Sequence, residues 1–447
     1  MVILMMENRS FDHILGYRSL PPFNLSVEGL QADPAWLARV ANPDQDQVIQ
    51  PFLSDNPYTM PDDFDPPHER SNVAANLGPL QGGTYPMNGF VSGIPASVSN
   101  DPQVRNLVMG YFGAAQVPIS HFLAQNFTIC DHWFSSLPAG TQPNRLMSMS
   151  GFTLIDVNHD MLPPQDLVYD WLDRKGISWR VYHQGIPFFT MMLKWVPEIL
   201  LSDRFRSFAD LENDLMNTPP DELPQVIFVE PTYQDAPHIG FATDEHAPAG
   251  ISNGQEFLMQ TYNAVTNSPA FWNRTVMIVD YDEHGGFFDH VSPPMLPTHP
   301  PAGATYTQPF ASLGVRTPGF VISPFVKAGF VNRAILDHTS VLKLIGERFG
   351  GGSYSEVVDA RPVASLSAVL DFSQSINPPP SAPALDAYLA PRPPRPAGAT
   401  VPDPKTKLQK GFQNALNQLQ QGGADANHPK FGELIGQLPS TAPGTAA

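Results

Sequence analysis

Asp280-Tyr281-Asp282-Glu283-His284-Gly285-Gly286-Phe287-Phe288-Asp289-His290 is the stretch of sequence that decides the fold, and it follows the apolar run Val276-Met277-Ile278-Val279 directly. A short apolar run that ends abruptly in acids is typical of a buried strand that delivers side chains to the carboxyl edge of a sheet. Ligands bind at that edge in open α/β sheets. The stretch therefore predicts both a strand and the edge of a site.

The acids in this stretch can be buried or solvated. Burying several carboxylates together is costly unless a cation or strong donors offset their charge. A solvated acidic turn is the alternative, but Gly285-Gly286 and the flanking Phe287-Phe288 are more typical of a tight, partly buried loop. We interpret the stretch as half of a metal site.

Composition limits the function classes. The chain has 447 residues, of which 42% are hydrophobic and 15% charged, and this predicts a globular protein with a large core. A formal net charge of −18 argues against nucleic acid as a partner and against electrostatic attraction to anionic membranes. Cys130 is the single cysteine, which excludes an intrachain disulfide; we expect it to be a buried small apolar residue.

The sequence carries no transmembrane or export signal that we can identify. It has no run of about 18 apolar residues, the length that predicts a transmembrane helix. The opening Met1–Met6 is too short for a signal peptide and lacks a basic flank. We expect a cytoplasmic protein, or a secreted or periplasmic one if an upstream export signal is missing.

Strand and helix patterns alternate along the chain. Strands are predicted at 2–5, 179–182, 226–229, 276–279 and 320–322, and helices at 164–174, 254–266 and 339–349. This alternation favours an α/β fold, a three-layer sandwich with a mostly parallel central sheet. Residues 41–105 and 184–222 are rich in proline and weakly periodic, so we interpret them as insertions that shape a site.

The C-terminal part differs in composition. We predict a catalytic domain over 1–375, an extended proline-rich linker over 376–404, and an amphipathic helix with a tail over 405–447. The helix is predicted because apolar residues recur at helical spacing, and we favour its packing against the body over membrane binding. These residues are Leu408, Phe412, Leu416 and Leu419.

The residues that follow the predicted strand 2–5 have the same pattern as those that follow 276–279, and we call each of these strand ends a strand tip. Glu7 and Asn8 follow the predicted strand 2–5, and their side chains offer the oxygen ligands that divalent cations take. Taken alone, this pair could be a turn with a helix cap at Ser10. Two such tips together predict a shared site.

The segment Gly140-Thr141-Gln142-Pro143-Asn144-Arg145 lies between the two tips in sequence. Pro143 and Asn144 suit the start of a helix, and helix N-termini stabilise anions such as phosphate. A threonine hydroxyl is a poor nucleophile unless a base or a metal activates it. Thr141 is therefore a candidate nucleophile, with a simple helix cap as the alternative.

Three histidines are candidates for contacts with phosphate oxygens. His183 follows the strand 179–182, His246 lies in a loop after the strand 226–229, and His68 lies in Asp65-Pro66-Pro67-His68. A single histidine is more often structural, but three beside an acidic site would suit phosphate binding and proton delivery to a leaving group.

These residues carry a family resemblance. The motifs at 6–13, 141–145 and 282–291, with Arg316-Thr317-Pro318-Gly319 and Asp337-His338-Thr339-Ser340, resemble the bacterial phosphoesterase family of non-specific phospholipases C and acid phosphatases. The similarity covers roughly residues 1–350 and implies an alkaline-phosphatase-like fold. It implies Thr141 as nucleophile, phosphoryl contacts from His68, His183 and His246, and a metal site formed by Glu7, Asn8, Thr141, Asp282 and Glu283. Asn144 and Arg145 of the second motif are our candidates for substrate binding.

We therefore expect a metal-dependent phosphoester hydrolase that acts through a phosphothreonine intermediate. A phospholipase C-like diesterase is favoured because few cations lie near the site, the motifs offering only Arg9, Arg70 and Arg145. An acid phosphatase is the alternative, and a non-catalytic protein that binds phosphorylated ligands is the alternative of another class. The substrate could be a phospholipid, with acyl chains meeting Phe188-Phe189, Met191-Met192 and Trp195, unless these residues form core.

The cofactor expected is one divalent metal ion. Oxygen ligands alone permit Ca, Mg or Mn, whereas Zn prefers some nitrogen.

Overall fold

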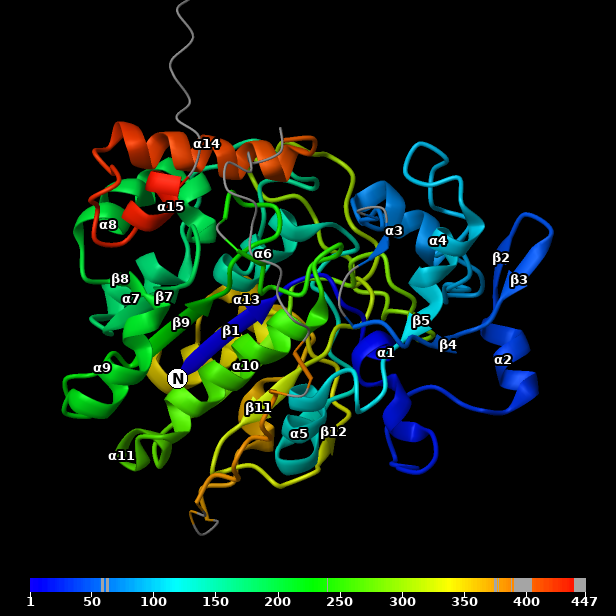
Figure 1. Ribbon diagram of the computed structural model, residues 1–447, viewed down its shortest axis with the longest axis horizontal. Helices are drawn as coiled ribbons and strands as arrows, with labels where there is room; N and C mark the ends of the chain where they lie inside the picture. Colours follow the sequence, from blue (N-terminus) through cyan, green and yellow to red (C-terminus); the bar gives the residue numbers. More distant parts are fainter. Residues whose placement is uncertain are drawn as a thin grey trace, which may run out of the picture.

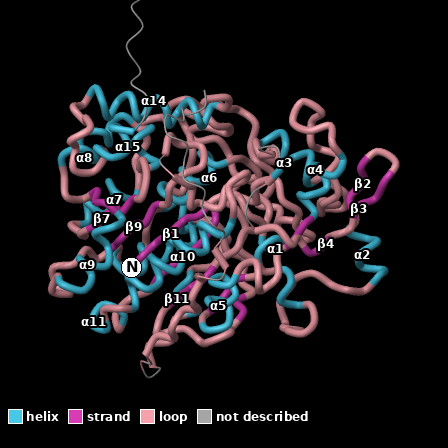
Figure 2. The backbone as a smooth tube through the Cα atoms, in the orientation of Figure 1, coloured by secondary structure: helices cyan, strands magenta, loops and turns pink. Residues whose placement is uncertain are grey.

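A computed structural model describes residues 1–57, 60–61, 64–238, 240–373, 376, 378–386, 388–389 and 404–437. Its centre is an eight-stranded sheet in the order β12-β6-β11-β10-β1-β9-β7-β8, which Figure 2 shows between layers of helix and loop. Each pair of neighbouring strands is parallel except the two pairs that include β11. The strands are β1 (Val2–Met6), β6 (Thr128–Cys130), β7 (Trp179–His183), β8 (Phe205–Ser207), β9 (Val226–Glu230), β10 (Met277–Tyr281), β11 (Phe320–Ile322) and β12 (Val331–Asn332).

Helices cover both faces of the sheet, which confirms the predicted sandwich. One layer contains α10 (Ile251–Thr266), in contact with α5 (Pro118–Asn126), α9 (Leu211–Asn217) and α11 (Pro269–Trp272). In Figure 1, α10 and α5 lie in front of the strands. The opposite layer contains α12 (Thr339–Phe349), in contact with α6 (Thr141–Ser150) and α13 (Glu356–Ala360), while α6 also contacts α7 (Val168–Lys175).

Strand alternation decides which side chains reach α6. Ile3 and Met5 of β1 and Asp280 of β10 line a small apolar cavity together with residues of α6 and α12. Successive strand residues point to opposite faces, so the next residues on this face are Glu7 after β1 and Asp282 after β10. The alternation therefore directs both carboxylates towards the α6 layer.

The predicted strands all occur in this sheet, but three of its members were not predicted. β6, β8 and β12 are only two or three residues long. The expected insertion 184–222 contributes β8 and also contains α8 (Val196–Leu201) and α9. Cys130 is buried at the end of β6 and is not part of a disulfide.

The other expected insertion, 41–105, lies beside the sheet and has a core of its own. Buried side chains of this core include Trp36, Phe64 and Phe90. The elements in and around it are α1 (Phe11–Ile14), α2 (Pro34–Val40), β2 (Asn42–Asp44), β3 (Gln47–Ile49), β4 (Phe52–Leu53), α3 (Arg70–Leu77), α4 (Pro102–Asn106) and β5 (Gly110–Tyr111).

The C-terminal helix packs against the body, as predicted. Leu408, Phe412, Leu416 and Leu419 of α14 (Lys407–Gln421) are buried in the main core. α15 (Gly432–Gln437) follows α14. Residues 390–403 of the predicted linker and 438–447 of the predicted tail lie outside the described residues, so the domain boundaries stay predictions.

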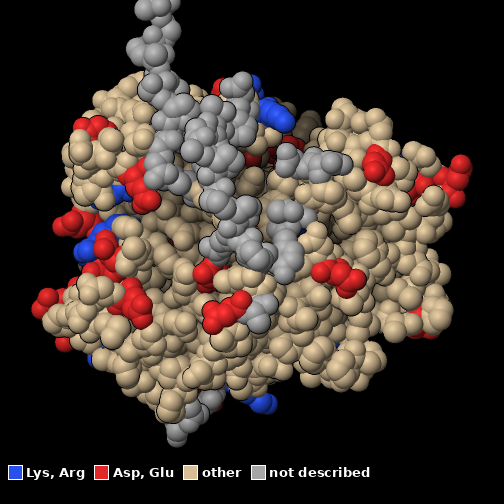
Figure 3. All heavy atoms as spheres, in the orientation of Figure 1, with Lys and Arg blue, Asp and Glu red and all other residues tan. Residues whose placement is uncertain are grey.

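The described residues bear on membrane insertion and on surface charge. Among the described residues, we find no helix with the length and apolar character needed to cross a bilayer. The face in Figure 3 carries more acidic than basic side chains, in keeping with the net charge of −18.

Candidate functional site

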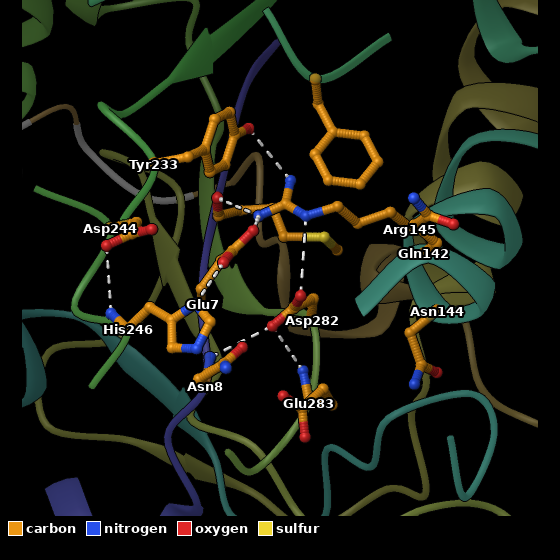
Figure 4. A network of polar contacts seen from close by, with 12 residues as sticks. Glu7, Asn8, Gln142, Asn144, Arg145, Tyr233, Asp244, His246, Asp282 and Glu283 are labelled. Atoms are coloured by element: carbon orange, nitrogen blue, oxygen red, sulfur yellow. Dashed lines mark hydrogen bonds and ion pairs between the residues drawn. The ribbon is translucent and has the colours of Figure 1, made fainter. Parts of the chain in front are cut away.

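The two predicted strand tips meet. The backbone amide of Asn8 donates to Oδ1 of Asp282 over 3.1 Å, and the amide of Glu283 donates to the same oxygen over 2.8 Å. Asn8 has a φ of 59°, a conformation that asparagine tolerates better than most residues. Figure 4 shows Glu7, Asn8, Asp282 and Glu283 converging on one region.

Thr141 begins α6 on the side that faces this region. The N-cap of the helix is Gly140, so Thr141 is the first helical residue and not a cap. Residues four apart share a helix face, and Arg145 on that face contacts both Glu7 and Asp282. The hydroxyl of Thr141 is fully buried. By contrast, Ser10 does cap a helix, accepting a bond from the amide of His13.

The five predicted metal ligands share one property. Each has a buried side-chain oxygen that lacks a hydrogen-bond partner in the described structure, although buried polar atoms are nearly always paired. A set of carboxylate, amide and hydroxyl oxygens of this kind fits a hard divalent cation. The oxygens are Glu7 Oε1, Asn8 Oδ1, Thr141 Oγ1, Asp282 Oδ2 and Glu283 Oε1.

Arg145 provides positive charge among these carboxylates. Its Nη2 lies 3.0 Å from Glu7 Oε1 and its Nε lies 3.6 Å from Asp282 Oδ2. Nη1 donates to the hydroxyl of Tyr233 over 3.2 Å, as Figure 4 shows. The guanidinium also stacks on the ring of Phe188, 4.7 Å from its centroid. Arg145 is thus engaged by the protein, and the predicted contact with substrate stays a prediction.

The carboxylates differ in their ease of ionisation. Burial and the neighbouring charge of Glu7 raise the pKa of Asp282 to about 7. Burial also acts to raise the pKa of Glu283, but His68 and His284 outweigh it and lower that pKa below its usual range. A site that resists ionisation of one carboxylate gains from a bound cation.

His246 lies at the centre of a group of acids. Nδ1 is 3.1 Å from Glu7 Oε2 and 3.7 Å from Asp235 Oδ2, while Nε2 is 3.3 Å from Asp65 Oδ1. Burial acts to lower the pKa of His246, but Asp65 and Asp235 outweigh it and raise the pKa well above the usual value. Its backbone amide donates to Asp244.

His68 belongs to the same region. Its ring lies 5.4 Å from that of His246, centroid to centroid. Nε2 is 3.3 Å from the side-chain nitrogen Nδ2 of Asn8 and 3.8 Å from Glu283 Oε1. Burial acts to lower its pKa, but Glu283 and Asp65 raise it to about 9. The structure therefore brings His68 and His246 to the predicted ligands.

His183 has other neighbours. It ends β7, which is separated from β1 by β9. Its Nδ1 lies 2.7 Å from the carbonyl oxygen of Gly185, and its ring stacks on Phe431 near the C-terminal helices. The phosphoryl contact of His183 stays a prediction, and its ring lies against the C-terminal segment.

Asn144 is hydrogen-bonded to the loop before α6. Its side-chain oxygen accepts from the amide of Leu137 over 2.9 Å, and its nitrogen donates to the carbonyls of Leu137, Ala139 and Gly140. These bonds involve both the oxygen and the nitrogen of the side-chain amide. Asn144 therefore shapes the loop that leads into Thr141, and its predicted contact with substrate stays a prediction.

The aromatic and methionine residues considered for acyl chains form core. Phe188, Phe189, Met191, Met192 and Trp195 are all buried in the main hydrophobic cluster. The interpretation as core, which the sequence left open, is the one that the structure supports.

Sequence reasoning did not assign several residues that hold the site together. Asp65 and Asp235 flank His246, Tyr233 bonds to Arg145, and Asp244 accepts the amide of His246. Asp65 and Asp244 lie within three residues of His68 and His246, and this proximity in sequence could have marked them as candidates. Asp235 and Tyr233 gave no comparable signal.

A family model describes most of the chain. The model of the Phosphoesterase family matches residues 1–351. That span includes the strand tips, the start of α6 and both histidines of the site.

Curated relatives resemble the same region. The chain is 33% identical over 347 residues to non-specific phospholipase C1 of Arabidopsis thaliana, an alignment that covers 74% of this chain and 61% of the relative. It is 31% identical to phospholipase C B of Mycobacterium tuberculosis, covering 86% of this chain and 79% of the relative. The chain thus spans about three fifths of the length of the plant relatives that it matches.

Solved structures match less closely. Phosphonate monoester hydrolase from Silicibacter pomeroyi superposes with a TM-score of 0.35 at 12% identity, over 57% of this chain and 71% of that one. A protein in the alkaline phosphatase superfamily from Vibrio parahaemolyticus gives a TM-score of 0.33 at 10% identity, over 56% and 64%. At this level, superposition adds nothing to what the sheet itself shows.

Proposed function

Since this chain belongs to the Phosphoesterase family, we propose that it is a metal-dependent phosphoester hydrolase of the phospholipase C type that uses Thr141 as its nucleophile. One observation carries the proposal. Five side chains from two strand tips and one helix start each have a buried oxygen without a hydrogen-bond partner. Glu7 Oε1 and Asp282 Oδ2 face Arg145, and Glu283 Oε1 lies 3.8 Å from His68, whereas Asn8 Oδ1 and Thr141 Oγ1 have neither kind of partner in the described structure. Evolved proteins rarely leave such atoms unpaired unless a ligand or ion satisfies them.

Glu7, Asn8, Thr141, Asp282 and Glu283 would hold the cation. When bound, a divalent cation lowers the pKa of a coordinated hydroxyl and offsets negative charge on phosphoryl oxygens. The ligand set has oxygen donors only, which supports Ca, Mg or Mn over Zn. The identity of the ion is part of the experiment below.

The residues of the chain supply the rest of the reaction. The hydroxyl of Thr141 loses its proton to solvent, and its oxygen attacks phosphorus, forming a new P–O bond while the bond to the leaving alcohol breaks. The start of α6 adds the positive end of a helix dipole behind the phosphoryl group. Water then cleaves phospho-Thr141, which releases the phosphorylated product and restores the hydroxyl.

His68 and His246 suit proton transfer and contact with the phosphoryl oxygens. Both rings are buried, and neighbouring carboxylates hold them in place. Carboxylates that pair with a histidine favour its protonated form, the form that can donate to a leaving alkoxide. Asp65 and Asp235 orient His246 for this role.

Charge near the site favours a diester substrate. Arg145 is engaged by Glu7 and Asp282, and Arg70 forms an ion pair with Asp156 over 2.7 Å. These two guanidinium groups are thus occupied by carboxylates. A monoester carries nearly two negative charges at neutral pH and needs more neutralisation than a singly charged diester. Relatives named phospholipase C support the same choice.

A substrate panel tests the proposal. Metal-free protein is loaded separately with Ca²⁺, Mg²⁺, Mn²⁺ or Zn²⁺ and assayed from about pH 4 to pH 9 with p-nitrophenyl phosphorylcholine, p-nitrophenyl phosphate and phosphatidylcholine. We expect the diester to give the higher kcat/KM near neutral pH, and monoester hydrolysis to rise only below about pH 6, where the monoester itself becomes singly charged.

Other outcomes identify the alternatives. Monoester preference at every pH would make the protein an acid phosphatase-like enzyme. Full metal occupancy without turnover of any ester would identify a non-catalytic protein that binds phosphorylated ligands.

A further inference from the structure

A small second cavity lies at the start of α10. It measures about 30 Å³ and is lined by residues of several segments, among them Arg9, His13, Phe112, Gly250 and Ile251. It does not include any of the five predicted metal ligands. A cavity of this size has room for one or two water-sized groups but not for phosphate or sulfate.

His13 lines this cavity without a hydrogen-bond partner. The side chain is 2% exposed, and neither Nδ1 nor Nε2 has a partner in the described structure. Its ring packs edge-on against Phe112 and Phe287, with centroids 4.5 and 4.1 Å apart. A buried imidazole in apolar surroundings normally has at least one partner, so a ligand in the cavity would account for it.

Arg9 brings positive charge to the same cavity. Its Nε donates to the carbonyl oxygen of Glu245 over 2.8 Å, and its guanidinium lies 4.5 Å above the ring of Phe287. Within the described residues, Arg9 forms no ion pair with a carboxylate. The carboxylate of Glu245 accepts instead from Gln255 and Tyr281. The carboxylates of Glu245, Asp244 and Asp65 lie near enough to favour its charged form, but in the described structure none of them is hydrogen-bonded to the guanidinium.

The start of α10 adds to this positive potential. The helix has 16 residues, and its N-cap is Gly250, which has no side chain to accept bonds from the first turn. The amide of Ser252 in this turn donates to the carbonyl oxygen of Pro57 over 3.4 Å. The start of the helix as a whole carries partial positive charge and favours anions. Three independent elements therefore present donors or positive charge to one cavity.

We propose that this cavity binds a small monovalent anion of the size of chloride or bromide. A halide fits the volume, accepts from imidazole and amide N–H groups, and offsets the charge of Arg9. Water would fit as well, but an anion is the stronger acceptor for the imidazole, guanidinium and amide donors that line the cavity. An anion that binds only the folded state raises its stability in proportion to the logarithm of the anion concentration.

Thermal unfolding tests the proposal without reference to catalysis. Tm is measured in sodium chloride, sodium bromide and sodium gluconate at equal ionic strength, with EDTA present, for the wild type, His13→Phe and His299→Phe. Phe at position 13 removes the imidazole and occupies cavity volume, whereas His299 is exposed and serves as the matched control. We expect halide to raise Tm by several degrees over gluconate in the wild type and His299→Phe, and not in His13→Phe.

A second measurement needs no variant. Crystals of the wild-type protein grown in sodium bromide should give an anomalous difference peak between Arg9 and His13. Ordered water alone at that position, or a halide effect that persists in His13→Phe, would overturn the proposal. Equal Tm values of the wild type in halide and gluconate would overturn it too.

Discussion

Arg145 and Glu7 form a buried ion pair, with Nη2 3.0 Å from Oε1. The same guanidinium approaches Asp282 through Nε, so one arginine offsets charge on carboxylates from two strand tips. This pairing explains how the protein can bury the acids before the proposed cation binds.

Replacing Arg145 with Met should destabilise the metal-free protein strongly. Loss of one partner of a buried pair leaves uncompensated charge and costs about 3–5 kcal/mol. A divalent cation should restore part of the loss, because it would offset the same carboxylates. Chemical denaturation in EDTA and with saturating metal measures both effects. Arg174→Met, which removes an exposed ion pair, is the control and should change little. If metal does not reduce this loss of stability, Arg145 and the cation do not offset the same carboxylates.

Replacing Asp282 with Asn should lower metal content and raise the Tm of the metal-free protein. Burial and Glu7 raise the pKa of Asp282, so the folded state disfavours its ionised form, and asparagine removes that charge at nearly the same volume. Elemental analysis and thermal unfolding in EDTA at about pH 7.5 check the two effects. Asp221→Asn, at an exposed position, is the control. Metal content equal to that of the wild type would show that Asp282 is not a ligand.

Glu245 should make stability depend on pH. Burial raises its pKa to about 7, although bonds from Gln255 and Tyr281 oppose the shift. For a carboxyl group whose pKa is raised by folding, stability is fully present below the unfolded pKa and is lost as pH rises through the folded pKa. The loss between pH 4.5 and 7 is on the order of 3 kcal/mol. Glu245→Gln should therefore flatten the stability profile over this window, while the exposed Glu222→Gln should not. If the pH dependence of stability is unchanged in Glu245→Gln, the titration of Glu245 is not its cause.

The C-terminal helix should support the site. Phe412 of α14 stacks on Tyr233, with ring centroids 5.3 Å apart, and the hydroxyl of Tyr233 accepts from Arg145. Gln409 of the same helix donates to Asp235, which faces His246. Phe412→Ala should cost about 3–5 kcal/mol of stability and reduce kcat/KM about tenfold at a temperature where the variant is folded. Phe372→Ala, at a position 69% exposed, is the control. Full activity in folded Phe412→Ala would show that α14 does not support the site.

The sequence predicted the central strands and the meeting of the two strand tips because both depend on local pattern. An apolar run followed by acids marks β1 and β10, and their parallel pairing then brings Glu7 and Asp282 together. The direction of β11 could not be predicted, since apolar alternation is the same in parallel and antiparallel strands. β12 has two residues and gave no periodic signal.

The remaining parts of the site depend on contacts between distant segments. Asn144 was expected to bind substrate, but its partners are carbonyl groups of the loop before α6, a fact that only the folded loop reveals. Asp235 reaches His246 through the fold of the loop 231–246 and had no motif of its own. The burial of Arg145 between two acids could likewise not be predicted from its position in the sequence.

Trapping the proposed covalent intermediate tests the central claim most directly. Metal-loaded protein is mixed with p-nitrophenyl phosphorylcholine, quenched in acid within milliseconds, digested and examined by mass spectrometry, with Thr141→Ala and Thr153→Ala run in parallel. Thr153 is a buried threonine outside the site and is the matched control. We predict that a phosphorylcholine adduct forms on the peptide containing Thr141, and that Thr141→Ala loses both the adduct and turnover while Thr153→Ala keeps them. Near wild-type kcat in folded, metal-loaded Thr141→Ala would contradict the account.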